Sequence, residues 1–280
     1  MPGPWLGPVY DWLGLFFEPL FLRRAALALL LLTPVSAAAG VLVVNQRLAF
    51  FADAVGHSVF FGVALALLLN VAEQPVILAT GLVIGLLVIY LSRHSRLAAD
   101  TVIGLVFSGT IALGLAIVSR HPATARGLSR FFLGDILTLA DSDILTLAFL
   151  AVLAALFLYF FYNRLTLASL SPVLARNRGT RADSLAPYAF GAFLALVVTL
   201  GVRSVGVLLV TALLVAPAAA ARNWAASASA MFRLAVIISL ISGQLGLWLS
   251  TRPQINTATG ATVVLVAVAV FILSHFSRRR

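Results

Sequence analysis

Long apolar segments separated by short polar ones make up most of this chain. A membrane-spanning helix needs about 20 predominantly apolar residues, so the pattern predicts an all-α, polytopic membrane protein with eight or nine transmembrane helices. The apolar segments lie at residues 25–44, 50–70, 75–92, 101–119, 143–162, 187–201, 204–220, 232–250 and 260–276. The count is open at 187–220, where Arg203 and Gly206 interrupt the run. Two short spans, or one span and a broken helix, both fit that region.

The beginning of the chain has a different pattern. Between Val9 and Leu22, aromatic and leucine side chains recur at near-helical spacing, but the segment is too short and too polar to span a membrane. An amphipathic helix that lies in the membrane interface is expected there. We therefore predict an N-terminal interfacial segment at 1–24 and a single transmembrane domain at 25–280.

The composition agrees with the pattern and excludes several kinds of site. Apolar residues make up 62% of the 280 residues and charged residues only 10%, which is far from the balance of a soluble domain. The sequence has no Cys, which excludes disulfides and thiolate metal sites. It also has no Lys, since all 19 basic residues are Arg, and this excludes a P-loop lysine. We do not expect the chain to hydrolyse ATP.

The formal charge of +10 suggests nucleic-acid binding at first sight, but the arginines lie in small clusters between apolar runs. Such clusters are typical of loops held on the cytoplasmic side. With nine spans and the C-terminus inside, 12 arginines lie inside and 7 outside. Arg23 and Arg24 on the outside are the weakest point of this orientation. The polar segment 163–186 then lies inside, and 120–142 lies outside.

Asp53 and His57 are the main candidates for chemistry. They lie four residues apart in a run of apolar and aromatic residues, so a helix places both side chains on one face. A carboxylate and an imidazole suit Zn²⁺, Mn²⁺ or Fe²⁺, and ionisable residues within a span are costly unless they have a role. The alternative is an Asp–His hydrogen bond without metal. Two ligands suit transient binding during transport, and a symmetric dimer could double their number.

The depth of this pair depends on how the chain enters the membrane. If the helix starts near residue 50 at the membrane surface, Asp53 lies about 5 Å deep and His57 about 10 Å deep. A non-helical stretch over 45–52 would place both nearer the middle. Between them, Gly56 allows a neighbouring helix to approach closely.

The remaining acids and histidines have simpler explanations. Asp100, Asp141, Asp143 and Asp183 each come just before or at the start of an apolar run, where an N-cap is expected. Asp135 follows Gly134 and would lie near the outer mouth of a pore, where it could attract cations, although a cap or turn is the first interpretation. Incidental positions are expected for the other histidines, which are His94, His121 and His275.

Five segments, in this order, resemble those of the membrane permeases of metal-ion ABC importers, the zinc/manganese/iron uptake family, with the zinc-uptake permease closest. They are Phe51–His57, Ala99–Gly104, Phe132–Leu137, Leu170–Ala175 and Gly206–Arg222. The last resembles a family element that begins with one Gly, continues through Leu-Leu and ends in Pro-Ala-Ala-small-Ala-Arg. The chain departs from the family pattern at Gly56, at Phe60-Phe61 and at Val173, which leaves the metal and the docking surface open.

The resemblance implies a fold like that of type II ABC importer permeases and a role in ATP-driven uptake of a divalent metal. Zinc is the main expectation, with manganese or iron as alternatives. The resemblance implies Asp53 and His57 as residues of the metal pathway, with Asp100 and Asp135 as secondary metal candidates. ATP would be bound by two copies of a separate cytoplasmic ATPase docked on 163–186. An extracytoplasmic metal-binding protein would deliver the ion. A second permease copy would complete a homodimer in the bacterial inner membrane. No permanently bound cofactor is implied. The implied ATPase-coupling residues are Ser171, Pro172, Leu174, Ala175, Arg176, Arg178 and Arg181.

Two other classes remain open from the residues alone. A secondary transporter or channel would move metal without ATP, but would need a coupling-ion site, and few acids lie within the spans. A structural membrane protein would not need the costly Asp53–His57 pair. Copurification with an ATPase would exclude the first, and loss of transport on replacing the pair would exclude the second.

Overall fold

The computed structural model describes residues 20–120, 136–170, 181–252 and 257–277, with the side chains of 167–170 and 181–184 left out. These parts of the chain are all helical apart from their connections. The helices are α2 Leu20–Asn45, α3 Phe51–Leu69, α4 Glu73–His94, α5 Ala99–Val118, η2 Ile136–Thr138, α7 Asp141–Leu170, α9 Arg181–Val205, α10 Val207–Trp224, α11 Ala228–Ser250 and α12 Thr259–Phe276.

Nine of these helices are long and apolar enough to cross a membrane, within the described residues. The all-α prediction and the upper count are therefore confirmed. The uncertain region around 187–220 holds two spans, because Gly206 adopts a φ of 91° that separates α9 from α10. A side chain is strained at this φ, so a glycine is well suited to the break. The expected interfacial segment falls mostly outside the described residues, and α2 begins at Leu20.

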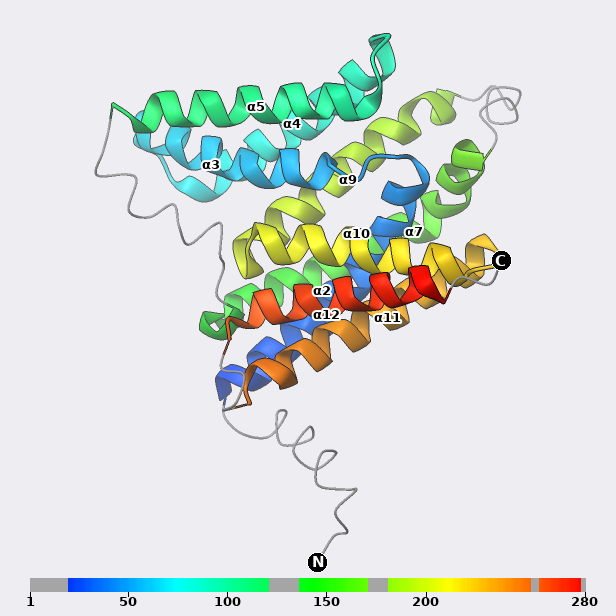
Figure 1. Ribbon diagram of the computed structural model, residues 1–280. Helices are drawn as coiled ribbons and strands as arrows, with labels where there is room; N and C mark the ends of the chain where they lie inside the picture. The colour runs from blue at the N-terminus through cyan, green and yellow to red at the C-terminus, as the bar shows by residue number, and fades with distance from the viewer. Residues whose placement is uncertain (1–19, 121–135, 171–180, 253–256, 278–280) are drawn as a thin grey trace, which may run out of the picture.

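Two groups of helices lie side by side (Figure 1). Helices α3, α4 and α5 pack together; in the other group α2 packs on α7, α10 and α11, and α12 packs on α10 and α11. Helix α9 joins the groups because it contacts α3 and α4 as well as α10 and α7. The largest apolar core runs through both groups and includes Phe51, Phe190 and Leu213, all fully buried. The metal candidates on α3 therefore lie where the two groups meet.

Glycines allow the closest of these contacts. At Gly40 on α2, an added Cβ would collide with the backbone oxygen of Leu214 on α10. At Gly246 on α11, it would lie 2.5 Å from the Cα of Val263 on α12. The sequence-based expectation that small residues permit close packing is confirmed at both crossings. Gly109 on α5 differs, because no atom lies within 4 Å of the position of its Cβ.

Helix α2 ends in a Schellman motif that leads into α3. The Leu48 N–H donates to the Val43 carbonyl at 3.0 Å, and the Arg47 N–H donates to the Val44 carbonyl at 3.4 Å. Arg47 takes the left-handed position with a φ of 59°, where glycine is more usual. The Arg222 guanidinium of α10 donates to the same Val44 carbonyl at 3.4 Å. Helix α10 thereby supports the turn from which α3 begins.

Candidate functional site

The α3 helix places Asp53 and His57 one turn apart, as expected from their spacing, and both are partly buried. The Nδ1 atom of His57 lies 2.8 Å from the backbone oxygen of Asp53. Because a carbonyl oxygen can only accept, Nδ1 carries the hydrogen, and a neutral ring then has its lone pair on Nε2. In a metal site, such a hydrogen bond would keep the ring in its binding orientation. The carboxylate of Asp53 is not used in it.

The pair lies well inside the helix bundle even though α3 starts at Phe51. The Phe51 ring reaches Gly85 of α4, which is about 14 Å from the end of that helix at His94. The His57 ring lies edge-on to Phe107, with 4.9 Å between ring centroids and 82° between planes. Phe107 is about 12 Å along α5 from its start at Ala99. The start of α3 is therefore recessed, which takes the pair deeper than a start at the bundle surface would.

Helices that are distant in sequence enclose the pair. Gly56 is buried against the α9–α10 junction, where an added Cβ would lie 3.1 Å from Val207 and 3.6 Å from Val202. The expected close approach at Gly56 is confirmed. The Thr211 hydroxyl of α10 lies beside the Asp53 carboxylate, within reach of a hydrogen bond to it. Sequence analysis missed both Thr211 and Phe107, since only the packing of α10 and α5 on α3 brings them to the pair.

The secondary candidates do not join this site in the part of the chain that is described. Asp100 is exposed in the first turn of α5, about 10 Å along the helix from Phe107. The expected N-cap role is also wrong, because Ala98 is the N-cap residue of α5. Asp135 lies outside the described residues. No group of three or more His, Asp or Glu residues that could hold a metal is found in the described ranges.

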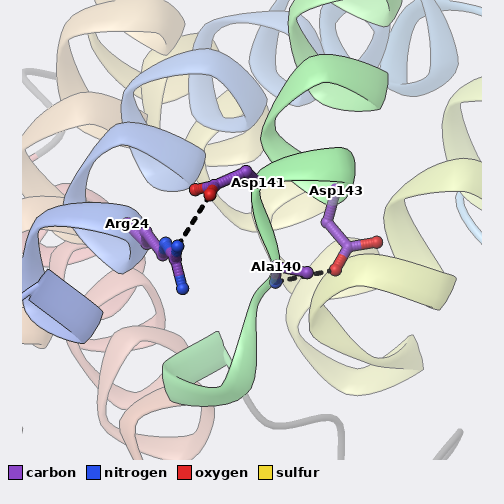
Figure 2. Close-up of polar contacts among 4 residues, drawn as sticks. All are labelled: Arg24, Ala140, Asp141 and Asp143. Carbon is purple, nitrogen blue, oxygen red and sulfur yellow. Dashed lines mark hydrogen bonds and ion pairs between the residues drawn. The ribbon is translucent and has the colours of Figure 1, made fainter.

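Two other acids lie at the start of α7 (Figure 2). Asp141 forms an ion pair with Arg24 of α2, with 2.8 Å between Oδ2 and Nη2. Asp143 accepts a hydrogen bond at 3.0 Å from the backbone N–H of Ala140, just before the helix. The expectation that Asp141 and Asp143 are N-caps is therefore wrong for Asp141. Asp143 satisfies a helix-start N–H from the third helical position, in the manner of a capping box.

The Arg24–Asp141 ion pair concerns the predicted orientation of the chain in the membrane. Arg24 was expected outside, where positive charge is less common, and Asp141 on the same end of the bundle offsets its charge. With nine spans and the C-terminus inside, the 7 outer arginines include Arg203 and Arg252. The Arg252 guanidinium lies 4.2 Å from the Trp248 ring centroid, and the Gln74 amide faces Arg203. Arg203 lies in the last turn of α9 and Arg252 just after the end of α11.

The expected ATPase-coupling residues fall largely outside the described part of the chain, since 171–180 are not described. Arg181 is the first residue of α9, and its side chain is among those left out. Helix α7 continues to Leu170, whereas the apolar segment predicted from the sequence ended at 162. Helix α9 starts at Arg181, whereas its apolar segment began at 187. Apolar patterning marks only the part of a helix within the membrane, and both helices extend beyond it.

The histidines judged incidental remain outside the site where they are described. His94 bonds through Nδ1 to the Tyr90 carbonyl at 2.9 Å and stacks on the Tyr90 ring. His275 lies in the last turn of α12. His121 falls outside the described residues.

Comparisons with known proteins give a consistent result. The sequence model of the ABC 3 transport family matches residues 19–278. The chain is 30% identical to the high-affinity zinc uptake system membrane protein ZnuB of Haemophilus influenzae, over 94% of this chain and 99% of that protein. It is 29% identical to the manganese import system permease protein ScaB of Streptococcus gordonii, over 91% of each chain.

A solved structure is similar along nearly the whole chain. It is PsaBC from Streptococcus pneumoniae in complex with Fab, with a TM-score of 0.80 and 26% sequence identity. The alignment covers 96% of this chain and 95% of that chain. A second structure, an inward-facing conformation of a putative metal-chelate type ABC transporter, shares the fold with a TM-score of 0.73 at 16% identity.

Proposed function

The chain belongs to the ABC 3 transport family and is a multi-pass inner-membrane permease of a metal ABC transporter, and from this we propose that its cargo is zinc, bound in transit by Asp53 and His57. The observation that carries the proposal is the arrangement on α3. The Nδ1–H of His57 is held by a backbone carbonyl, so Nε2 can bind a cation one turn away from the Asp53 carboxylate. Nitrogen and carboxylate ligands together are a usual zinc set.

A sparse ligand set suits a transport site. Structural zinc sites usually have four protein ligands, whereas this site has two among the described residues. An ion that must leave again should be held weakly enough to be released. The recessed position of the pair, among apolar helices, supports a role along the route of the ion.

Manganese is the second candidate cargo. The relatives from Streptococcus gordonii and from Listeria are named for manganese, and the one from Haemophilus influenzae for zinc. Carboxylate and hydroxyl oxygens around Asp53 also suit manganese, which prefers oxygen ligands. Competition between zinc, manganese and iron for uptake into proteoliposomes would rank the three, and preference for manganese or iron would overturn the zinc assignment.

Asp53→Asn and His57→Ala test the site itself. Each change should abolish uptake while the permease still assembles with its ATPase, because each removes one of the two proposed ligands. Asp100→Asn is a matched control, since Asp100 is exposed and away from the pair. Normal uptake by both site variants would exclude the proposed site.

The energy source is proposed to be a separate ATPase subunit docked on the coupling segment 163–186. This is supported by family membership and by the absence of Lys, without which the chain has no P-loop of its own. Replacing Arg176, Arg178 and Arg181 together by Ala should separate ATP hydrolysis from transport. Unchanged stimulation of the ATPase in that variant would count against the docking segment. Uptake by vesicles that lack any ATPase would instead support an ATP-independent transporter.

The proposed partners also include an extracytoplasmic metal-binding protein and a second permease copy. The second copy is expected on the outer face of α5, where small residues are exposed: Gly104, Ser108, Gly109, Ala112 and Ala116. Leucines are exposed between them, namely Leu105, Leu113 and Leu115, and helix α7 exposes larger aromatic side chains, among them Phe149 and Phe160, as expected against lipid. Small residues allow two helices to approach closely. This face adjoins the metal pair, because Phe107 of α5 contacts His57.

Because the sequence has no cysteine, the dimer can be tested by disulfide cross-linking in the otherwise unchanged chain. Ser108→Cys on α5 should form a cross-linked dimer in membranes under mild oxidation. Phe149→Cys on α7 is the control and should not. Cross-linking of the control alone would place the second copy elsewhere.

A further inference from the structure

The Asp53 carboxylate has a partner from a helix far away in the sequence. We propose that Thr211 is a positioning residue of the metal site, whose hydroxyl fixes the orientation of the Asp53 carboxylate and thereby sets the affinity for the transported cation. The inference rests on the proposed role of Asp53 and His57 in metal binding. It adds a residue from α10 to a site that otherwise lies on α3.

Two contacts fix the same register between α3 and α10. Gly56 faces Val207, with 3.1 Å between the position of an added Cβ and Val207 Cγ1. One turn back along α3 is Asp53, and one turn forward along α10 is Thr211, so this register brings the hydroxyl within reach of the carboxylate. The two helices therefore cross in opposite directions, and the meeting of Thr211 with Asp53 follows from the packing at Gly56.

Helix α10 holds Thr211 in place from its other sides. The helix begins directly after Gly206, and the next turn after Thr211 contains Leu214, whose backbone oxygen lies against Gly40 of α2. Leu213 and Leu214 are fully buried. The backbone of α10 at Thr211 is thus fixed between α2 and α3, so the hydroxyl has a defined position relative to Asp53.

The hydroxyl has a choice of two acceptors. Its own helix offers the Leu208 carbonyl at 3.3 Å, which is long for an O–H donor. The charged carboxylate is the stronger acceptor, since charge-assisted hydrogen bonds are shorter and stronger than neutral ones. When Thr211 donates to one carboxylate oxygen, the rotation of the Asp53 side chain is restricted, and the other oxygen is presented to the cation.

The two proposed ligands are then held in the same manner. His57 is oriented by the Asp53 backbone carbonyl, and the Asp53 carboxylate is oriented by Thr211. Partners of this kind keep a ligand in its binding orientation, and their removal usually weakens metal binding by about 10- to 100-fold. We therefore expect the hydroxyl of Thr211 to affect the KM for metal more than the maximal rate.

The test is zinc uptake by the complete transporter, with its ATPase and metal-binding protein, in proteoliposomes. Thr211→Val keeps the shape of the side chain but removes the hydroxyl, and should raise the KM for zinc about tenfold. Thr211→Ser keeps the hydroxyl and should restore the KM. Thr33→Val is the matched control, because Thr33 is a buried threonine between α2 and α11 whose hydroxyl has no partner in the structure.

The outcomes separate this inference from the proposed function. If Asp53→Asn abolishes uptake but Thr211→Val keeps the wild-type KM, the role of Thr211 is wrong and the metal site stands. If Asp53→Asn transports normally, the metal site itself is wrong. Equal losses in Thr211→Val, Thr211→Ser and Thr33→Val would indicate a packing defect and overturn the inference. If the transporter with Thr211→Val fails to assemble, Thr211→Ala is tested in its place, because it removes the hydroxyl without putting a methyl group at that position.

Discussion

Replacing Gly40 by Ala should destabilise the crossing of α2 and α10. An added Cβ would overlap the Leu214 carbonyl oxygen, with the Leu214 carbonyl carbon at 2.9 Å and the Ala218 Cβ at 3.4 Å. These are mostly backbone atoms, which cannot rotate away as the end of a flexible side chain can. The two helices would have to separate to accommodate a single methyl group.

The size of the effect follows from two opposing contributions. Glycine in the interior of a helix costs about 1 kcal/mol relative to alanine, so the substitution gains this amount in helix propensity. Overpacking a well-packed core costs about 1–3 kcal/mol, and a clash with backbone belongs at the upper end of that range. The expected net loss is therefore about 2 kcal/mol. It falls on the helix that carries Thr211.

The assay is thermal unfolding of the purified permease in detergent, followed by the fluorescence of its 4 tryptophans. For a chain of this size each kcal/mol shifts the melting temperature by about 2–4 °C, so Gly40→Ala should lower it by about 4–8 °C. Gly260→Ala is the matched control, because the nearest atom to its added Cβ is Leu209 Cβ at 4.0 Å. It should leave the melting temperature unchanged or raise it slightly. A Gly40→Ala protein as stable as Gly260→Ala would refute the close crossing.

Three further predictions concern the ends of α2. Arg222→Ala should lower the melting temperature by a few degrees, because it removes a charged donor to the Val44 carbonyl, and Arg222→Lys should recover part of the loss. Equal melting temperatures of the wild type and both variants would argue against the contact. Arg47→Gly should stabilise the protein by up to about 1 kcal/mol by relieving the left-handed backbone at φ 59°, and destabilisation in a thermal melt would contradict this. The Arg24–Asp141 pair should show a coupling free energy of at most about 1 kcal/mol in a double-mutant cycle of stability, and it should decrease with salt because the Asp141 side chain is 80% exposed. A larger coupling that does not depend on salt would be inconsistent with an exposed pair.

The sequence predicted eight or nine spans and their approximate places because a bilayer imposes a length and an apolar composition on each helix. It also predicted that Asp53 and His57 share one face of a helix, because their spacing fixes that face. Helix ends were predicted less well. Helices α7 and α9 continue past their apolar segments, and Ala98 rather than Asp100 is the N-cap of α5.

The identity of the metal could not be derived from the pair alone. A carboxylate and an imidazole suit zinc, manganese and iron, and the relatives themselves are named for zinc or for manganese. Selectivity depends on the number and arrangement of all groups around the ion. Those groups include atoms from helices that the local sequence does not connect to α3.

By itself, then, the sequence determined that this chain is a polytopic helical membrane protein with an acid and a histidine on one face of a span. These properties depend on composition and on spacing within one helix. Only the tertiary structure decided how deep the pair lies and what surrounds it, because the recessed start of α3 is measured against Gly85 of α4 and Phe107 of α5. The contact of Thr211 with Asp53 likewise requires α10 to cross α3 at Gly56, and contacts between helices so distant in the chain arise only from packing.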